Sequence, residues 1–299
     1  MSGAVALGSM VTIGGCSLAL DPGEQQCSTS EDCVSSGYKD LVCSGHVCQR
    51  SAATPDAAPT ADADAGPPPD PIWGCLGHVP KPTWDSSQLL HFTLTLNYLD
   101  KSPVADATVD VCDISDVTCT GTDPRYPKGL KPDGAGNVAI AVLQGFDGFI
   151  WIRGPDVMES RFYVGQPLLQ PPTIKILSLI KPKDYPLILN LAHQTVDLTR
   201  GSAIFFVADC SAHAASGVKF SSPEADDKSK LFYLVNALPL LPPGISATDV
   251  EGFGGFFNLP EGSAAVEARR ASDDAFVGRS SFVVSPNSIS FVYVTPSPI

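Results

Sequence analysis

The chain has 299 residues, of which 43% are hydrophobic and 17% are charged. Its 26 glycines and 27 prolines indicate a turn-rich protein and exclude a coiled coil or a largely helical fold. With 32 acidic and 19 basic side chains the formal net charge is −13, and such a surface repels a phosphate backbone. We therefore expect no nucleic-acid partner, and the length suggests about two domains.

Residues 1–16 carry no charged side chain and end in Ile-Gly-Gly before Cys16. Small apolar residues in this order are typical of a secretory signal peptide. The ending resembles a bacterial lipobox, in which the cysteine is the lipid-modified residue. Bacterial signal peptides begin with Lys or Arg, and this segment has neither. Two alternatives therefore remain: the true start codon lies upstream, or the match is accidental and Cys16 is a spare thiol. We predict lipidation at Cys16, with the membrane as partner through the lipid.

Four cysteines follow within residues 17–50, at Cys27, Cys33, Cys43 and Cys48. The residues around them are too polar for a hydrophobic core, so this module needs cross-links or a metal. Zinc is the competing explanation, but the first pair is spaced by five residues and zinc knuckles are shorter. We predict two disulfides, with three pairings open. The pattern resembles small cysteine-rich modules of secreted proteins.

Residues 51–72 consist mainly of Ala, Pro and Asp. Such a segment buries too little area to offset the entropy of ordering, and its prolines favour an extended spacer. We predict a disordered linker that separates the cysteine-rich module from the rest of the chain.

From residue 73 onward, polar and apolar side chains alternate in short runs separated by Gly and Asp turns. This alternation is typical of half-buried strands, and strands at this spacing indicate an antiparallel sandwich. The same order of turns and strands is then repeated. Asp133 and Asp249 begin similar turns 116 residues apart, which indicates an internal duplication. The strands expected in the first copy span residues 91–99, 107–112, 137–142 and 148–153.

The turn after Leu99, the Pro-Asp turn at 132–137 and the run Phe-Phe-Asn-Leu-Pro-Glu-Gly at 256–262 resemble the carboxypeptidase regulatory-like (transthyretin-like) domain. The resemblance is fuller over about 200–295 than over about 88–165. It implies an all-β chain with two tandem antiparallel β-sandwiches of transthyretin or Ig type, at 73–180 and 199–299. In that family the domain is an accessory or adhesive module without catalytic residues.

A short helix is expected within the connection 181–198. Asp184 can cap it, and Leu187, Ile188 and Leu191 would form its apolar face between the sandwiches.

Residues that could carry chemistry are scattered. The five histidines show no metal-binding spacing and no nucleophile motif is present, so we predict no catalytic residue, no metal site and no cofactor. The region 106–123 holds five aspartates, at Asp106, Asp110, Asp113, Asp116 and Asp123; we expect solvated carboxylates there, with calcium as the alternative. A second cluster is aromatic, and we expect it in the core, with a sugar-stacking platform as the alternative; it comprises Phe232, Tyr233, Phe253, Phe256 and Phe257.

Four cysteines remain. We predict one disulfide among Cys75, Cys112 and Cys119, whereas Cys210 has no obvious local partner. These features together predict an exported, non-catalytic surface protein, lipid-anchored at the cell envelope or outer membrane, which displays β-sandwich binding or structural modules to an unknown protein or glycan. The alternative is an accessory glycan- or metal-dependent binding protein associated with an extracellular enzyme.

Overall fold

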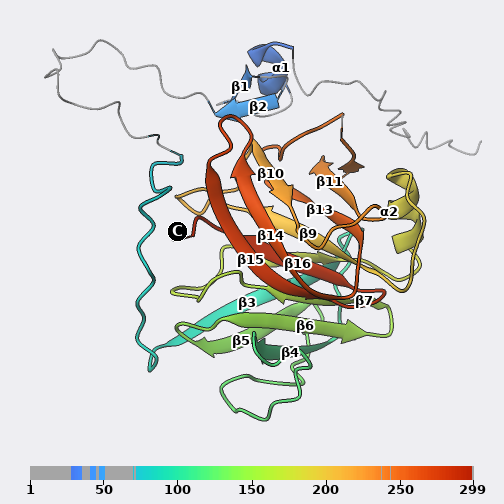
Figure 1. Cartoon of the computed structure of the whole chain (residues 1–299). Helices are drawn as coiled ribbons and strands as arrows, with labels where there is room; N and C mark the ends of the chain where they lie inside the picture. Colours follow the sequence, from blue (N-terminus) through green and yellow to red (C-terminus); the bar gives the residue numbers. More distant parts are fainter. Residues whose placement is uncertain are drawn as a thin grey trace, which may run out of the picture.

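The computed structural model describes residues 28–35, 41–44, 47–50, 70, 72–236, 238–242 and 244–297 (Figure 1). Cys16, Cys27 and most of the predicted linker lie outside these residues. The predicted all-β class is confirmed, because strands make up nearly all of the regular structure. Neither of the two described helices is long enough to cross a membrane.

The cysteine-rich module contains helix α1 (Ser30–Ser35) and a hairpin of β1 (Leu41–Ser44) and β2 (Val47–Arg50). Cys43 and Cys48 face each other in the hairpin register.

The first copy of the repeat, here called unit 1, comprises six strands, and the second copy, unit 2, comprises eight. Unit 1 has β3 (Leu89–Tyr98), β4 (Thr108–Asp113), β5 (Asn137–Leu143), β6 (Gly148–Gly154), β7 (Val157–Tyr163) and β8 (Ile176–Leu179). Unit 2 has β9 (Gly201–Val207), β10 (Val218–Ser221), β11 (Lys230–Val235), β12 (Leu238–Leu240), β13 (Phe253–Leu259), β14 (Gly262–Arg270), β15 (Phe276–Val284) and β16 (Ile289–Val294). The four strands expected in the first copy are confirmed as β3, β4, β5 and β6.

The two units have the same strand order. Unit 1 forms the sheets β5-β3-β8 and β4-β6-β7, and unit 2 forms the corresponding β13-β9-β16 and β10-β14-β15. The third strand of the first sheet runs parallel to its neighbour in both units, β8 beside β3 and β16 beside β9. Strands β11 and β12 extend the first sheet of unit 2. The topology therefore supports the internal duplication.

Two glycines occupy matching positions in the repeat. Leu96 and Val207 donate backbone hydrogen bonds to the carbonyl oxygens of Gly136 and Gly252, at 2.8 and 2.9 Å. Both glycines have positive φ, +81° and +72°, and a Cβ on either would lie within 3.0 Å of a backbone oxygen. Glycine is the residue that adopts this conformation without strain. The similar turns read from the sequence thus have one geometric cause.

The units are fused rather than separate, because β16 of unit 2 also pairs in parallel with β7 of unit 1. The result is one eight-stranded sheet, in the order β12-β11-β13-β9-β16-β7-β6-β4. The tandem sandwiches expected from the sequence therefore share a sheet, and β16 lies at the centre of it (Figure 1). The chain contains parallel as well as antiparallel pairs.

The shared sheet separates two hydrophobic cores. On β16, Phe291 belongs to one core and its neighbour Val292 to the other, because successive side chains point to opposite faces. The first core lies under β5-β3-β8 and includes Phe257 of unit 2. The second lies under β10-β14-β15 and includes Tyr163 of unit 1. Each core thus contains residues of both units.

The connecting helix α2 spans Tyr185–Leu191 and begins after Asp184, which makes no side-chain capping bond. The predicted apolar face is confirmed only at Ile188, which packs against the first core; Leu187 and Leu191 are 63% and 54% exposed. Instead Tyr185 and Leu189 are buried in the first core, and the Tyr185 hydroxyl lies 2.7 Å from the hydroxyl of Ser202 on β9. Positions four apart share a helix face, and the packed face is this one.

Candidate functional site

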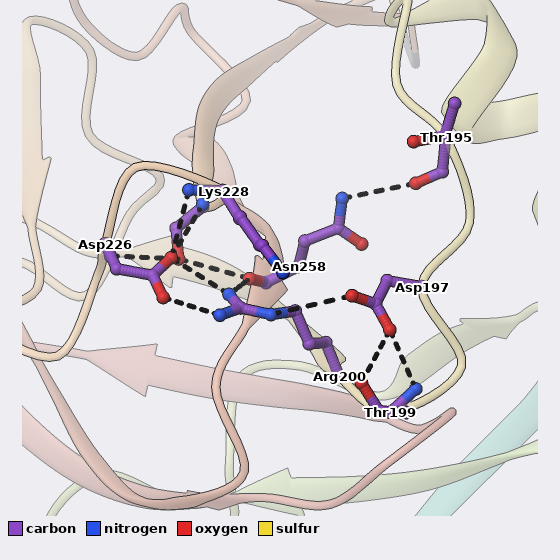
Figure 2. Close-up of polar contacts among 8 residues, drawn as sticks. Thr195, Asp197, Thr199, Arg200, Asp226, Lys228 and Asn258 are labelled. Carbon is purple, nitrogen blue, oxygen red and sulfur yellow. Dashed lines mark hydrogen bonds and ion pairs between the residues drawn. The ribbon is translucent and has the colours of Figure 1, made fainter.

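A polar cluster surrounds Arg200, where the connection between the units enters β9 (Figure 2). The preceding turn is closed by Asp197, whose Oδ1 accepts hydrogen bonds from the backbone N–H and the hydroxyl of Thr199, at 3.1 and 2.6 Å. Asp favours such turns because its side chain bonds backbone two residues on. The cluster also reaches the end of β13 and the loop between β10 and β11.

The guanidinium of Arg200 meets oxygens from three segments. Nη1 donates to the carbonyl oxygen of Asn258 at 2.6 Å and to Oδ1 of Asp226 at 2.9 Å, and Nη2 donates to Oδ2 of Asp226 at 2.5 Å. Nε lies 3.7 Å from a carboxylate oxygen of Asp197. Two parallel hydrogen bonds to a carboxylate fix both partners in orientation. They hold the pKa of Asp226 well below its usual range.

Asp226 and Ser229 complete the loop side of the cluster. The backbone N–H groups of Lys228 and Ser229 both donate to Oδ1 of Asp226 at 3.1 Å. The Ser229 hydroxyl lies 3.1 Å from the Asn258 carbonyl oxygen. The carboxylate therefore orders its own loop while it holds Arg200.

Asn258 lies where the pairing of β13 with β9 shifts register, and its φ is +55°. Asn tolerates this left-handed conformation better than most residues. Its side-chain amide donates to the Thr195 carbonyl oxygen at 3.2 Å, and only 7% of the residue is exposed. The tendency of Asn to adopt the left-handed conformation is the one sequence signal that points to Asn258. The residue lies within the run 256–262 that resembles the carboxypeptidase regulatory-like domain, and no role was predicted for it.

The cluster ties segments together rather than presenting a reactive group. Arg200 directs both terminal nitrogens at protein oxygens, and Asp226 accepts from side chain and backbone alike. These residues carry no common signal in the sequence, because Arg200 is 26 residues from Asp226 and 58 from Asn258.

The structure places the predicted disulfide residues as follows. Cys112 is bonded to Cys119 in unit 1, and Cys75 is bonded to Cys210, for which the sequence offered no partner. Cys43 is disulfide-bonded. For Cys33 and Cys48 only the backbone is described, in α1 and β2, and Cys16 and Cys27 lie outside the described residues.

The five aspartates of 106–123 do not converge. Asp110 is 6% exposed and pairs with Arg153, so the expectation of a solvated carboxylate is wrong there. Asp113 accepts from the hydroxyl of Tyr126 at 2.7 Å; burial and this bond raise the pKa of Tyr126 to about 12. Asp116 accepts from the backbone of Gly121 at 2.7 Å. Across the described ranges, no three His, Cys, Asp or Glu side chains form a group that could hold a metal ion.

The aromatic cluster belongs to the core. Phe232, Tyr233, Phe256 and Phe257 are buried, with at most 6% of each exposed, and Phe253 packs against Phe206 with ring centres 5.0 Å apart. The expectation of core packing is confirmed for the four buried rings.

Two shallow hollows lie on the outer side of unit 1, beside β3 and β5. The larger, about 500 Å³, is lined by Leu89, Pro124, Arg125, Pro127, Leu130, Ala139, Ala141 and Leu143. The smaller, about 250 Å³, shares Ala139 and Ala141. Arg125, which is paired with Asp123, is the one charged side chain among the residues that line the larger hollow, and His91 lines the smaller.

The buried carboxyl group of Asp249 is a weaker acid than an ordinary aspartate. Burial raises the pKa of Asp249 to about 6. Its Oδ1 accepts from the backbone N–H of Glu251 at 2.9 Å, in the turn before Gly252. It therefore shapes the repeated turn, as Asp133 does in unit 1 by accepting from the backbone of Asn137.

Comparison with known proteins gives structural matches only. No family model and no curated protein matches the chain. The shaft pilin SpaA from Lactobacillus rhamnosus GG aligns at 10% identity over 71% of this chain and 99% of its own, with a TM-score of 0.21. The major pilin subunit BcpA of Bacillus cereus aligns at 9% identity over 70% and 69%, with a TM-score of 0.23. A streptococcal ancillary pilin aligns at 12% identity over 68% of each chain, with a TM-score of 0.21.

Proposed function

We propose that this chain is an exported, non-catalytic structural protein, anchored at the cell envelope by lipid on Cys16, which displays two fused β-sandwich units. The observation that carries the proposal is the Cys75–Cys210 disulfide, which joins segments 135 residues apart. Disulfides of this kind persist in oxidising compartments outside the cytoplasm. The lipobox-like ending at Cys16 supplies the anchor.

The Arg200 cluster supports a structural role, because the guanidinium group binds backbone and side-chain oxygens of the fold itself. The resemblance of both units to the carboxypeptidase regulatory-like domain supports an accessory or adhesive module. A partner protein or glycan would then meet the surface of the units.

The experiment compares the chain with its Cys16→Ala variant in a bacterial host that processes lipoproteins. We expect radioactive palmitate to label the unaltered chain, and the chain to partition into the membrane fraction; the variant should lose both. Ser17→Ala, one position further on, is the matched control and should keep both. Equal membrane partitioning of the Cys16→Ala variant would remove the lipid anchor from the proposal.

A further inference from the structure

The disulfide between Cys75 and Cys210 closes a covalent loop around the whole of unit 1. The 135-residue separation encloses β3 to β8, α2 and β9. A stretched chain carries tension along its shortest covalent path, which here passes from Cys75 directly to Cys210. Everything inside the loop is outside that path.

The residues that lead into unit 1 are bound to unit 2. The Asp70 carboxylate lies 2.9 Å from Nη1 of Arg270, the last residue of β14. The backbone N–H of Cys210 donates to the Ile72 carbonyl oxygen at 3.2 Å. These contacts hold the leading segment, residues 70 and 72–77, on unit 2, as the disulfide does.

The chain also leaves the fold at this end of unit 2. Val294, the last residue of β16, is in register with Val207 of β9, and the N–H of Ala208 donates to its carbonyl oxygen at 2.9 Å. Cys210 follows two residues later. The two ends of the described fold therefore lie at one end of the same strand pair.

We propose that the Cys75–Cys210 disulfide transfers the mechanical attachment of the N-terminal part of the chain from unit 1 to unit 2. Tension between the two ends of the chain then crosses from Cys75 to Cys210 and acts on β10 to β16, while unit 1 is carried as an unloaded closed loop. Unit 1 follows the linker in the sequence, but under tension the linker pulls on unit 2. The inference goes beyond the proposed function, since it holds whichever end is anchored.

The test stretches the full chain between handles at its two termini, without reductant. The unaltered protein should release only the residues after Cys210, about 300 Å at roughly 3.5 Å per residue. A Cys75→Ser, Cys210→Ser double variant should extend further by the enclosed residues, except the seven that the Cys112–Cys119 bridge still closes, or about 450 Å. The N-terminal module contributes equally to both and cancels in the difference. Equal extension of the two proteins would overturn the proposal.

A Cys112→Ser, Cys119→Ser double variant is the matched control. Its missing bridge lies inside the closed loop, so its extension without reductant should equal that of the unaltered protein. Extension longer by tens of ångströms or more would mean that unit 1 is loaded, and would also overturn the proposal.

A second measurement does not require any variant to fold. Trypsin should cut after Arg125, whose side chain is 58% exposed. Because Cys112 and Cys119 both precede the cut, only Cys75–Cys210 joins the two fragments. They should migrate together on a non-reducing gel and separate after reduction; separation before reduction contradicts the closed loop. Neither measurement depends on Cys16, so failure here and failure of the lipid anchor are distinguishable.

Discussion

Arg200 fixes the start of unit 2 by binding the loop before β11 and the irregular end of β13 at once. Its side chain is 13% exposed, and its removal leaves the Asn258 carbonyl and the Asp226 carboxylate with fewer donors. Polar groups that lose their partners within a fold destabilise it more than a lost surface contact does.

We therefore expect Arg200→Met to lower the thermal unfolding midpoint by about 3–6 °C at neutral pH. Arg279→Met, at an exposed position of β15, is the matched control and should change it little. Because Arg200 lowers the pKa of Asp226, the stability from this pair is complete above the ordinary carboxyl pKa and is lost as the pH falls. The difference between variant and unaltered protein should shrink in acid; a constant difference from pH 7 to pH 3 would contradict the ion pair.

Single residues were predictable from the sequence where their partners are local. Cys112 and Cys119 are seven residues apart, and the turns at Asp133 and Asp249 are closed by backbone groups two to four residues on. The partner of Cys210 was not predictable, because 135 residues separate it from Cys75 and only the assembled fold brings them together. The same holds for the Arg200 cluster.

Strand β16 is the element on which both units depend. It pairs in parallel with β9 on one side and with β7 on the other, and all six of its residues are buried. Phe291 sits opposite Ile204 of one unit and Phe162 of the other. A cavity at this position would therefore loosen both neighbours.

We expect Phe291→Ala to lower the free energy of unfolding by about 3 kcal/mol, the usual cost of emptying a buried aromatic site. Leu187→Ala, on the exposed side of α2, should cost less than about 0.5 kcal/mol. Urea denaturation of the three proteins measures both effects. Similar losses for the two variants would show that β16 does not join the units.

Strands could be predicted from the sequence where one of their two faces is exposed. Strands β3 and β5 alternate buried and exposed residues, so their period was readable. Strand β16 has no polar face, because it is covered on both sides, and its position between two units left no periodic signal. In α2 several apolar residues lie on more than one side, and tertiary packing selected Tyr185 and Leu189 over Leu187 and Leu191.

At the scale of the molecule, the shared sheet makes the two units one cooperative structure. Each core contains side chains of both units: the ring of Tyr163 in unit 1 lies 6.3 Å from that of Phe282 in unit 2, and its hydroxyl accepts the N–H of Val283 at 3.0 Å. Separate sandwiches joined by a linker would not share packing in this way.

We therefore expect one unfolding transition. Trp151 lies on β6 of unit 1 and Trp84 lies just before β3, whereas Trp73 packs against the second core. Tryptophan fluorescence of a Trp73→Phe variant therefore reports unit 1, and far-ultraviolet circular dichroism reports both units. The midpoints in urea should coincide. Two separate midpoints would mean that the units unfold independently.

The duplication could be read from the sequence, but the fusion could not. Repeated turns reveal that two similar sandwiches exist, whereas the pairing of β7 with β16 joins strands more than 120 residues apart and adds no turn of its own. Edge strands of two sandwiches can meet in many registers, and the choice depends on the packing of both cores.

The place of β16 also sets the order in which the protein can be completed during synthesis. A ribosome delivers the chain from its N-terminus, and β16 emerges after every other described strand of the two units. Until then the edges of β7 and β9 lack the strand that separates them, although every other strand of both units is already present. Newly made molecules therefore pass through a stage with two unpaired strand edges, at which pairing with another chain competes with the arrival of residues 289–294.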